Sequence, residues 1–105
     1  MFRHPAITRY CERVGEVLHV EPAKLMSGQR LGARVCEARQ LVMALVRATT
    51  KLSLNEIGIG LGGRDHTTVL HGVRATHQRI ERDEQFRSYV LGNFPELLRE
   101  REVPK

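Results

Sequence analysis

The sequence has 105 residues, of which 41% are hydrophobic and 28% are charged, and this composition excludes a disordered chain and predicts one globular domain over residues 1–105. It contains no run of about 18 apolar residues, which excludes a membrane-spanning helix, and its basic start lacks the continuous apolar segment of a secretory signal. The formal net charge is +5, and residues 30–79 hold all of it, with eight basic and three acidic side chains.

Hydrophobic residues recur every three or four positions along most of the chain, which predicts an all-α fold of about five or six helices. The first helix is expected over residues 5–19, with Pro5 in its first turn. A short helix is expected within residues 20–26, beginning near Pro22. Residues 27–34 contain two glycines and two arginines, so they are expected to form an exposed basic loop.

Residues 36–100 predict four further helices. Residues 36–50 form an apolar stripe typical of a core helix. Ser53 and Glu56 have the spacing of a capping box, and the short helix that they begin runs into several glycines. A longer helix is expected over about 65–82 and a last one over about 84–100. The residues expected to face the core are Leu41, Val42, Leu45, Val46, Phe86, Val90, Phe94 and Leu97.

Residues 53–82 have the layout of a helix-turn-helix motif, in which the first turn of the second helix meets base edges in the major groove. Asp65 is placed to cap that helix, which leaves His66, Thr67 and Thr68 projecting from its first turn. The free amides of the same turn favour a phosphate. A purely structural cap is the alternative, but the charge excess of this region favours a polyanion such as nucleic acid.

The stretch GGRDHTTVLHGVRA, residues 62–75, resembles the signature of the C-terminal DNA-binding domain of the bacterial chromosomal replication initiator DnaA. The resemblance extends upstream through SLNEIGIGLGGRDHTTV and ARQLVMAL, and it covers roughly residues 8–82. It implies an all-helical fold of the Trp-repressor-like helix-turn-helix class. It also implies binding to short, asymmetric DnaA boxes at replication origins.

Carried over by position, the resemblance assigns roles in DNA binding to individual residues. Asp65, His66 and Thr67 would read bases in the major groove, and Leu70 would touch a thymine methyl group. Asn55 stands where the family often has a proline that contacts a base methyl, so the preference at that base is expected to differ. Phosphate contacts are expected for Arg39, Gln40, Arg47, Thr50, Lys51, Arg64 and Thr68.

The basic loop departs from the family pattern. The family inserts an arginine-rich loop into the minor groove, whereas this segment keeps only Arg30 and Arg34 and differs in length by one residue. Glu37 and Ala38 replace what is often an Arg-Pro pair. We therefore expect either Arg30 or Arg34 to reach the minor groove, with a lower affinity and an altered preference at that end of the site.

The sequence also lacks the GxxxxGK[ST] loop that the initiator's ATPase module requires. The resemblance therefore predicts the DNA-binding domain standing alone, without ATP or any other cofactor. The start at Met1 favours a natural chain over an excised fragment.

Other kinds of site receive little support from the sequence. His66, His71 and His77 are five and six residues apart, which does not align them on one helical face, and neither cysteine lies in a CxxC motif, so no metal site is expected. Asp65, His66 and Thr67 point in different directions from one helical turn, so no enzyme activity is expected. Cys11 and Cys36 are expected to be free thiols, buried or half-buried, rather than a disulfide.

These observations predict a cytoplasmic, nucleoid-associated protein that binds double-stranded DNA at DnaA-box-like sites without ATP. It would modulate replication initiation or transcription, and a monomer is expected because the family's sites are asymmetric. The alternative is a protein-interaction module that docks on the replication initiator or a related regulator, with weak or no specific DNA binding. The thinned basic loop keeps this alternative open.

Overall fold

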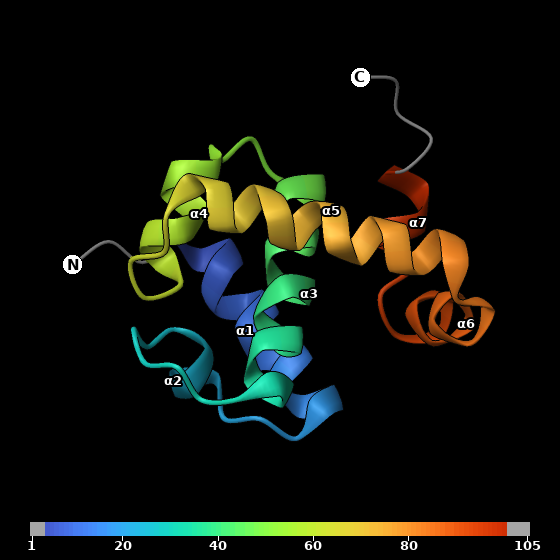
Figure 1. Ribbon diagram of the computed structural model, residues 1–105, viewed down its shortest axis with the longest axis horizontal. Helices are drawn as coiled ribbons and strands as arrows, with labels where there is room; N and C mark the ends of the chain where they lie inside the picture. The colour runs from blue at the N-terminus through green and yellow to red at the C-terminus, as the bar shows by residue number, and fades with distance from the viewer. Residues whose placement is uncertain (1–3, 101–105) are drawn as a thin grey trace.

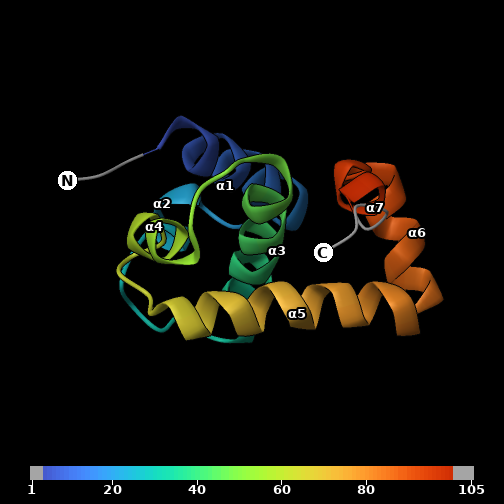
Figure 2. The ribbon, with the colours of Figure 1, turned by 90° about the horizontal axis from the view of Figure 1, so that it is seen from above.

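The computed structural model describes residues 4–100, with side chains up to residue 98, and this part of the chain is all-α, with no strand. Helix α3 stands in the middle of the fold, with α1 on one side and α5 on the other (Figures 1 and 2). The helices are α1 (Pro5–Leu18), α2 (Pro22–Leu25), α3 (Ala33–Thr49), α4 (Leu54–Gly60), α5 (His66–Arg82), α6 (Glu84–Asn93) and α7 (Glu96–Glu100).

Helix α3 forms the centre of the core because it has neighbours on several sides. The apolar stripe expected from the sequence, Leu41, Val42, Leu45 and Val46, is buried, and so is Met43 on the face turned towards α5. Its partners include Ile7 and Val14 of α1, Ile57 of α4 and Val69 of α5. The polar residues of α3 are therefore restricted to its ends and to narrow strips between the packed helices.

Helix α3 begins earlier than expected, and this corrects two predictions. The amide of Cys36 donates to the carbonyl of Gly32, so the helix begins at Ala33 and includes Arg34, which the sequence had assigned to the loop. The α2–α3 loop is therefore residues 26–32. Cys36 is exposed in the first turn of α3, whereas a buried or half-buried thiol was expected; Cys11 is buried, and both are free.

The last helix predicted over 84–100 is wrong in one respect, because it is two helices, α6 and α7. Phe94 has φ −139° and ψ 60°, outside the helical region, and Pro95 follows it. A proline lacks an amide hydrogen and disfavours helical geometry in the residue before it, so the chain bends at this point. All four residues expected to face the core, Phe86, Val90, Phe94 and Leu97, are buried.

Helices α6 and α7 return from the far end of α5 towards α1 and α3 (Figure 2). The Arg13 guanidinium holds this return in place, because it donates to both carboxylate oxygens of Glu96, at 2.5 and 3.0 Å, and to the carbonyl of Asn93 at 2.8 Å. The Tyr10 hydroxyl donates to the same carboxylate at 3.1 Å. No helix among residues 4–100 is long and apolar enough to cross a membrane.

Candidate nucleic-acid interface

Helices α4 and α5 are joined by residues 61–65, which we call the α4–α5 turn. The expected capping box is present at the start of α4: the Glu56 amide donates to the Ser53 hydroxyl, and the Ser53 amide donates to the Glu56 carboxylate. The amides of Gly63 and Arg64 both donate to the carbonyl of Gly58, at 3.0 and 2.8 Å. These bonds close the end of α4 and direct the chain straight into α5.

The first turn of α5 is open to solvent and rich in polar groups. Asp65 caps the helix as expected: its carboxylate accepts from the Thr67 amide at 3.2 Å and from the Thr67 hydroxyl. These two bonds, the hydroxyl first, keep the pKa of Asp65 below its ordinary value. The side chains of Asp65 and His66 are 63% and 60% exposed, so the cap leaves both available to a ligand.

This geometry determines what the first turn of α5 offers to a ligand. The Thr67 hydroxyl donates to Asp65, and the Thr67 side chain, with its methyl group, belongs to an exposed residue. The Nδ1 atom of His66 lies 3.5 Å from the other oxygen of Asp65. A carboxylate, an imidazole, a hydroxyl and a methyl group therefore lie close together, and these are the groups that match base edges and thymine methyls in the major groove.

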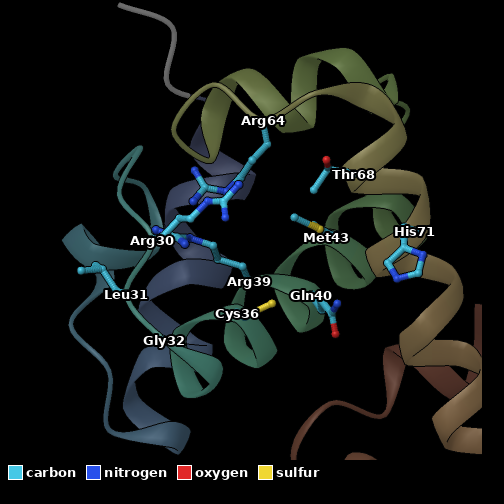
Figure 3. A pocket seen from close by; sticks show the side chains of 10 residues that line it. All are labelled: Arg30, Leu31, Gly32, Cys36, Arg39, Gln40, Met43, Arg64, Thr68 and His71. Atoms are coloured by element: carbon cyan, nitrogen blue, oxygen red, sulfur yellow. The ribbon is translucent and has the colours of Figure 1, made fainter.

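A pocket of about 420 Å³ adjoins the first turns of α5, between the α2–α3 loop and the N-terminal half of α3. Arg30, Arg39 and Arg64 converge on one side of it, with Thr68 and His71 on the other (Figure 3). Its lining residues are Arg30, Leu31, Gly32, Cys36, Arg39, Gln40, Met43, Arg64, Thr68 and His71. The pocket therefore combines positive charge with hydrogen-bonding groups beside an exposed helix start.

The arginines expected to contact DNA differ sharply in their surroundings. Arg30 is exposed and forms no hydrogen bond or ion pair with another residue in the described range 4–100. Arg34 donates through Nε and Nη2 to the carbonyl of Leu18 at the end of α1, at 3.0 and 2.5 Å. Of the two residues expected in the minor groove, only Arg30 is directed towards the pocket.

Arg39 requires a correction, because it is only 5% exposed. Its guanidinium donates to the carbonyls of Leu25 at 3.1 Å, Lys24 at 2.7 Å and Ser27 at 3.0 Å. Burial, followed by the positive charge of Arg64, lowers the pKa of Arg39. A buried guanidinium bonded to three carbonyls is a structural support, and we do not retain the expected phosphate contact.

Arg64 also differs from the expectation of a phosphate contact. Its Nη1 donates to the carbonyls of Ser27 at 2.9 Å and Leu61 at 2.7 Å, and its Nη2 donates to the carbonyl of Gln29 at 3.1 Å. These bonds join the α4–α5 turn to the α2–α3 loop across the sequence. Both Nη atoms are therefore bonded within the protein, although the Arg64 side chain still lines the pocket.

The remaining expected phosphate contacts lie on both sides of α5. Gln40 and Thr68 line the pocket at the N-terminal half of α3, whereas the C-terminal end of α3 emerges on the opposite side of α5 (Figure 1). Arg47 and Lys51 lie at that end and are exposed, although Arg47 also donates to the carbonyl of Leu52 at 3.1 Å. The Thr50 hydroxyl donates to the carbonyl of Val46.

Two expected base contacts lie outside the first turn of α5. Asn55 is exposed on α4, and Leu70 is half-buried on α5. The structure adds His71 to the candidates, because it is exposed and lines the pocket one turn after Thr67. The sequence leaves His71 open between a polar edge residue and a DNA contact, since its position beside the pocket depends on how α5 crosses α3. No cluster of metal-binding side chains occurs among the described residues.

Comparison with known proteins gives consistent matches. The family described as "Bacterial dnaA protein helix-turn-helix" matches residues 8–75. The chromosomal replication initiator protein DnaA of Thermomicrobium roseum is 48% identical over 66 residues, which are 63% of this chain and 14% of that protein. The same protein of two Ehrlichia ruminantium strains, Gardel and Welgevonden, is 34% identical over 89 residues, 83% of this chain and 19% of theirs. The chain thus spans less than a fifth of the length of these relatives.

Proposed function

Because the chain belongs to the bacterial DnaA helix-turn-helix family, we propose that it binds double-stranded DNA at DnaA-box-like sites through the first turn of α5. Asp65, His66 and Thr67 read base edges in the major groove, with Leu70 and Asn55 adding apolar and amide contacts. The observation that carries this proposal is the exposed polar turn beside a basic pocket. Such a turn has the size and chemistry that the major groove admits.

Phosphate contacts on either side of α5 fix the register of the protein on the duplex. Gln40 and Thr68 contact one strand from the pocket, and Arg47, Thr50 and Lys51 contact the other strand from the far end of α3. This division is supported by the way α5 crosses α3, which places the two ends of α3 on opposite sides of α5 (Figure 1). Arg30 enters the adjacent minor groove from the α2–α3 loop.

Binding by this chain needs no ATP, and one copy occupies one asymmetric site. The sequence offers no GxxxxGK[ST] loop to support a nucleotide requirement. A protein of this kind would act in the cytoplasm, associated with the nucleoid, where it competes with or modulates a replication initiator or regulates a nearby promoter.

A second function is favoured by one observation. Arg34, Arg39 and Arg64 are bonded to carbonyl groups of the protein itself, which leaves Arg30 as the exposed arginine of the α2–α3 loop. A protein-interaction module that docks on the initiator or a related regulator would need no more than this reduced positive surface. In that case duplex DNA would bind weakly and without sequence preference.

A selection with randomised duplexes, followed by a salt titration, separates the two functions. The DNA-binding proposal predicts enrichment of one motif and an affinity that falls linearly with the logarithm of salt concentration, in proportion to the phosphates contacted. The selected duplex should exceed a scrambled duplex by about 10³-fold or more. Equal affinity for the two duplexes, with retention of the protein by purified initiator, would support the interaction module instead.

A further inference from the structure

The α2–α3 loop and the α4–α5 turn are packed backbone against backbone. Gly62 has φ +88°, and a Cβ atom there would lie 2.1 Å from the carbonyl oxygen of Ser27. From the other side, a Cβ on Gly28 would lie 3.1 Å from the carbonyl oxygen of Gly62. No side chain fits between the two segments at Gly62, so the loop rests directly on the turn that starts α5.

Arg64 stabilises this contact with hydrogen bonds from both of its Nη atoms. Nη1 donates to the carbonyls of Ser27 at 2.9 Å and Leu61 at 2.7 Å, and Nη2 donates to the carbonyl of Gln29 at 3.1 Å. The carbonyl of Ser27 also accepts from Arg39 at 3.0 Å. Two guanidinium groups therefore hold the same stretch of loop, one from α3 and one from the turn (Figure 3).

The position of these bonds in the sequence links two parts of the proposed DNA interface. Gln29, which accepts from Arg64, directly precedes Arg30, the exposed arginine of the loop. Arg64 itself directly precedes Asp65, the cap of α5. The bond from Arg64 to Gln29 therefore connects the residue next to Arg30 with the residue next to the first turn of α5.

From this geometry we propose that Arg64 is a positioning residue, which holds Arg30 at a fixed distance from the first turn of α5. The proposal rests on the proposed function and deepens it. Adjacent minor and major grooves lie at a set spacing on a duplex, so both contacts form together only if the loop is already held at that spacing. If the loop is held in place before binding, the complex does not lose the conformational entropy that a mobile loop would lose on binding DNA.

A double-mutant cycle with Arg64→Lys and Arg30→Ala tests this role on the duplex enriched by the selection. Lysine keeps the positive charge, but a single ammonium group cannot reproduce the planar fork on two carbonyls. In the wild-type background, Arg30→Ala should weaken binding by about 10-fold or more. In the Arg64→Lys background, the same Arg30→Ala change should cost less than about 2-fold, because Arg30 no longer reaches its groove.

Base substitutions show which contact is lost. Inosine–cytosine pairs present the same minor-groove groups as adenine–thymine pairs but the major-groove groups of guanine–cytosine pairs. At the pair read by Arg30, wild type should accept inosine–cytosine in place of adenine–thymine and reject guanine–cytosine. Arg64→Lys should lose that discrimination and keep discrimination at the pairs read from α5.

Arg74→Lys serves as the matched control, because Arg74 is an exposed arginine on α5 that forms no hydrogen bond with the α2–α3 loop. Its effect should be additive with Arg30→Ala. In the free protein, the backbone amide order parameter of Arg30 should be about 0.85 in wild type and below about 0.6 in Arg64→Lys. Unchanged circular dichroism and an unchanged order parameter at Val69 would show that α5 remains folded.

Two outcomes would overturn the positioning role while leaving the proposed function intact. One is additivity of Arg64→Lys with Arg30→Ala on every duplex, as expected of a separate phosphate contact. The other is an Arg30 amide that stays equally ordered in Arg64→Lys. Failure of the wild-type protein to enrich any motif is a different result: it refutes the proposed function, and the positioning role falls with it.

Discussion

The guanidinium of Arg39 lies among the backbone carbonyls of Lys24, Leu25 and Ser27. These carbonyls belong to the end of α2 and to the loop after it, where helical hydrogen bonds run out. Arg39 thus provides a donor to the buried carbonyl of Leu25, whereas the carbonyls of Lys24 and Ser27 also accept from the Ser27 hydroxyl and from Arg64, respectively. At the scale of a single residue, an arginine that the family pattern assigned to DNA is part of the protein's internal support.

Replacing Arg39 should therefore affect stability before it affects DNA binding. Arg39→Ala should lower the free energy of unfolding by about 2–4 kcal/mol, because the buried carbonyl of Leu25 loses its donor, the bonds to Lys24 and Ser27 are lost, and the side chain leaves a cavity. Urea denaturation measures this change. Arg74→Ala, at an exposed position, should change stability by less than about 0.5 kcal/mol. Unchanged stability in Arg39→Ala, with uniformly weaker binding to all duplexes, would restore the phosphate role.

At the scale of elements, the α4–α5 turn offers a test of how closely the loop and the turn are packed. Gly62 and Gly63 have nearly the same positive φ, +88° and +83°, but a Cβ atom would meet neighbours within 4 Å only at Gly62. Both glycine-to-alanine changes incur backbone strain of about 1 kcal/mol. Only Gly62→Ala also collides with the backbone of Ser27.

Gly62→Ala should therefore destabilise the protein by at least about 2 kcal/mol more than Gly63→Ala. Thermal or urea unfolding of the two variants gives this difference directly, and Gly63→Ala controls for the shared strain. Equal losses of stability in the two variants would mean that the loop moves away at little cost, and the close contact between Gly62 and Ser27 would have no energetic role.

The ion pair between α1 and α7 makes the position of the C-terminal helices sensitive to pH. The Arg13 hydrogen bonds lower the pKa of Glu96 to about 2 from its ordinary value of 4.5. A carboxyl whose pKa is depressed in the folded state stabilises the protein above its unfolded pKa, and this contribution is lost as pH falls through the folded value. Stability should therefore decline from about pH 4.5 to about pH 2 on account of this group.

Glu96→Gln should remove this part of the pH dependence. The Glu96 side chain is 15% exposed and Arg13 is 37% exposed, so the contribution at neutral pH should be on the order of 2 kcal/mol after solvent screening. Urea denaturation between pH 2 and 7 measures it, with Glu16→Gln as an exposed control on α1. A Glu96→Gln curve parallel to wild type across this range would contradict the assignment.

At the scale of the whole molecule, the features that the sequence predicted well are those that depend on neighbouring residues. The apolar stripe of α3, the capping box at Ser53 and the cap at Asp65 are each set within about one turn of helix, and all three are present. The bend at Pro95 was also a local signal, but the apolar period continues through Phe94 and Leu97 and obscured it.

The features that the sequence did not predict depend on distant partners. Apart from the bond from Arg64 to Leu61, Arg39 and Arg64 bond to carbonyls 12 to 37 residues away. Carbonyl acceptors are common to every residue, so nothing in the sequence pattern identifies these partners. The exposure of Cys36 follows from where α3 begins, which is just after Gly32 and three residues earlier than expected. The candidate interface was therefore predictable at the first turn of α5 and only partly predictable around the pocket.

The central claim is that the exposed first turn of α5 reads bases. The most direct test is a comparison of wild type and His66→Ala on the selected duplex and on every single-base-pair variant of it. The claim predicts that His66→Ala loses about 1–3 kcal/mol on the preferred duplex and no longer discriminates at one or two adjacent pairs, while preferences elsewhere persist. A His66→Ala protein that is folded and keeps the wild-type preference at every pair would contradict it.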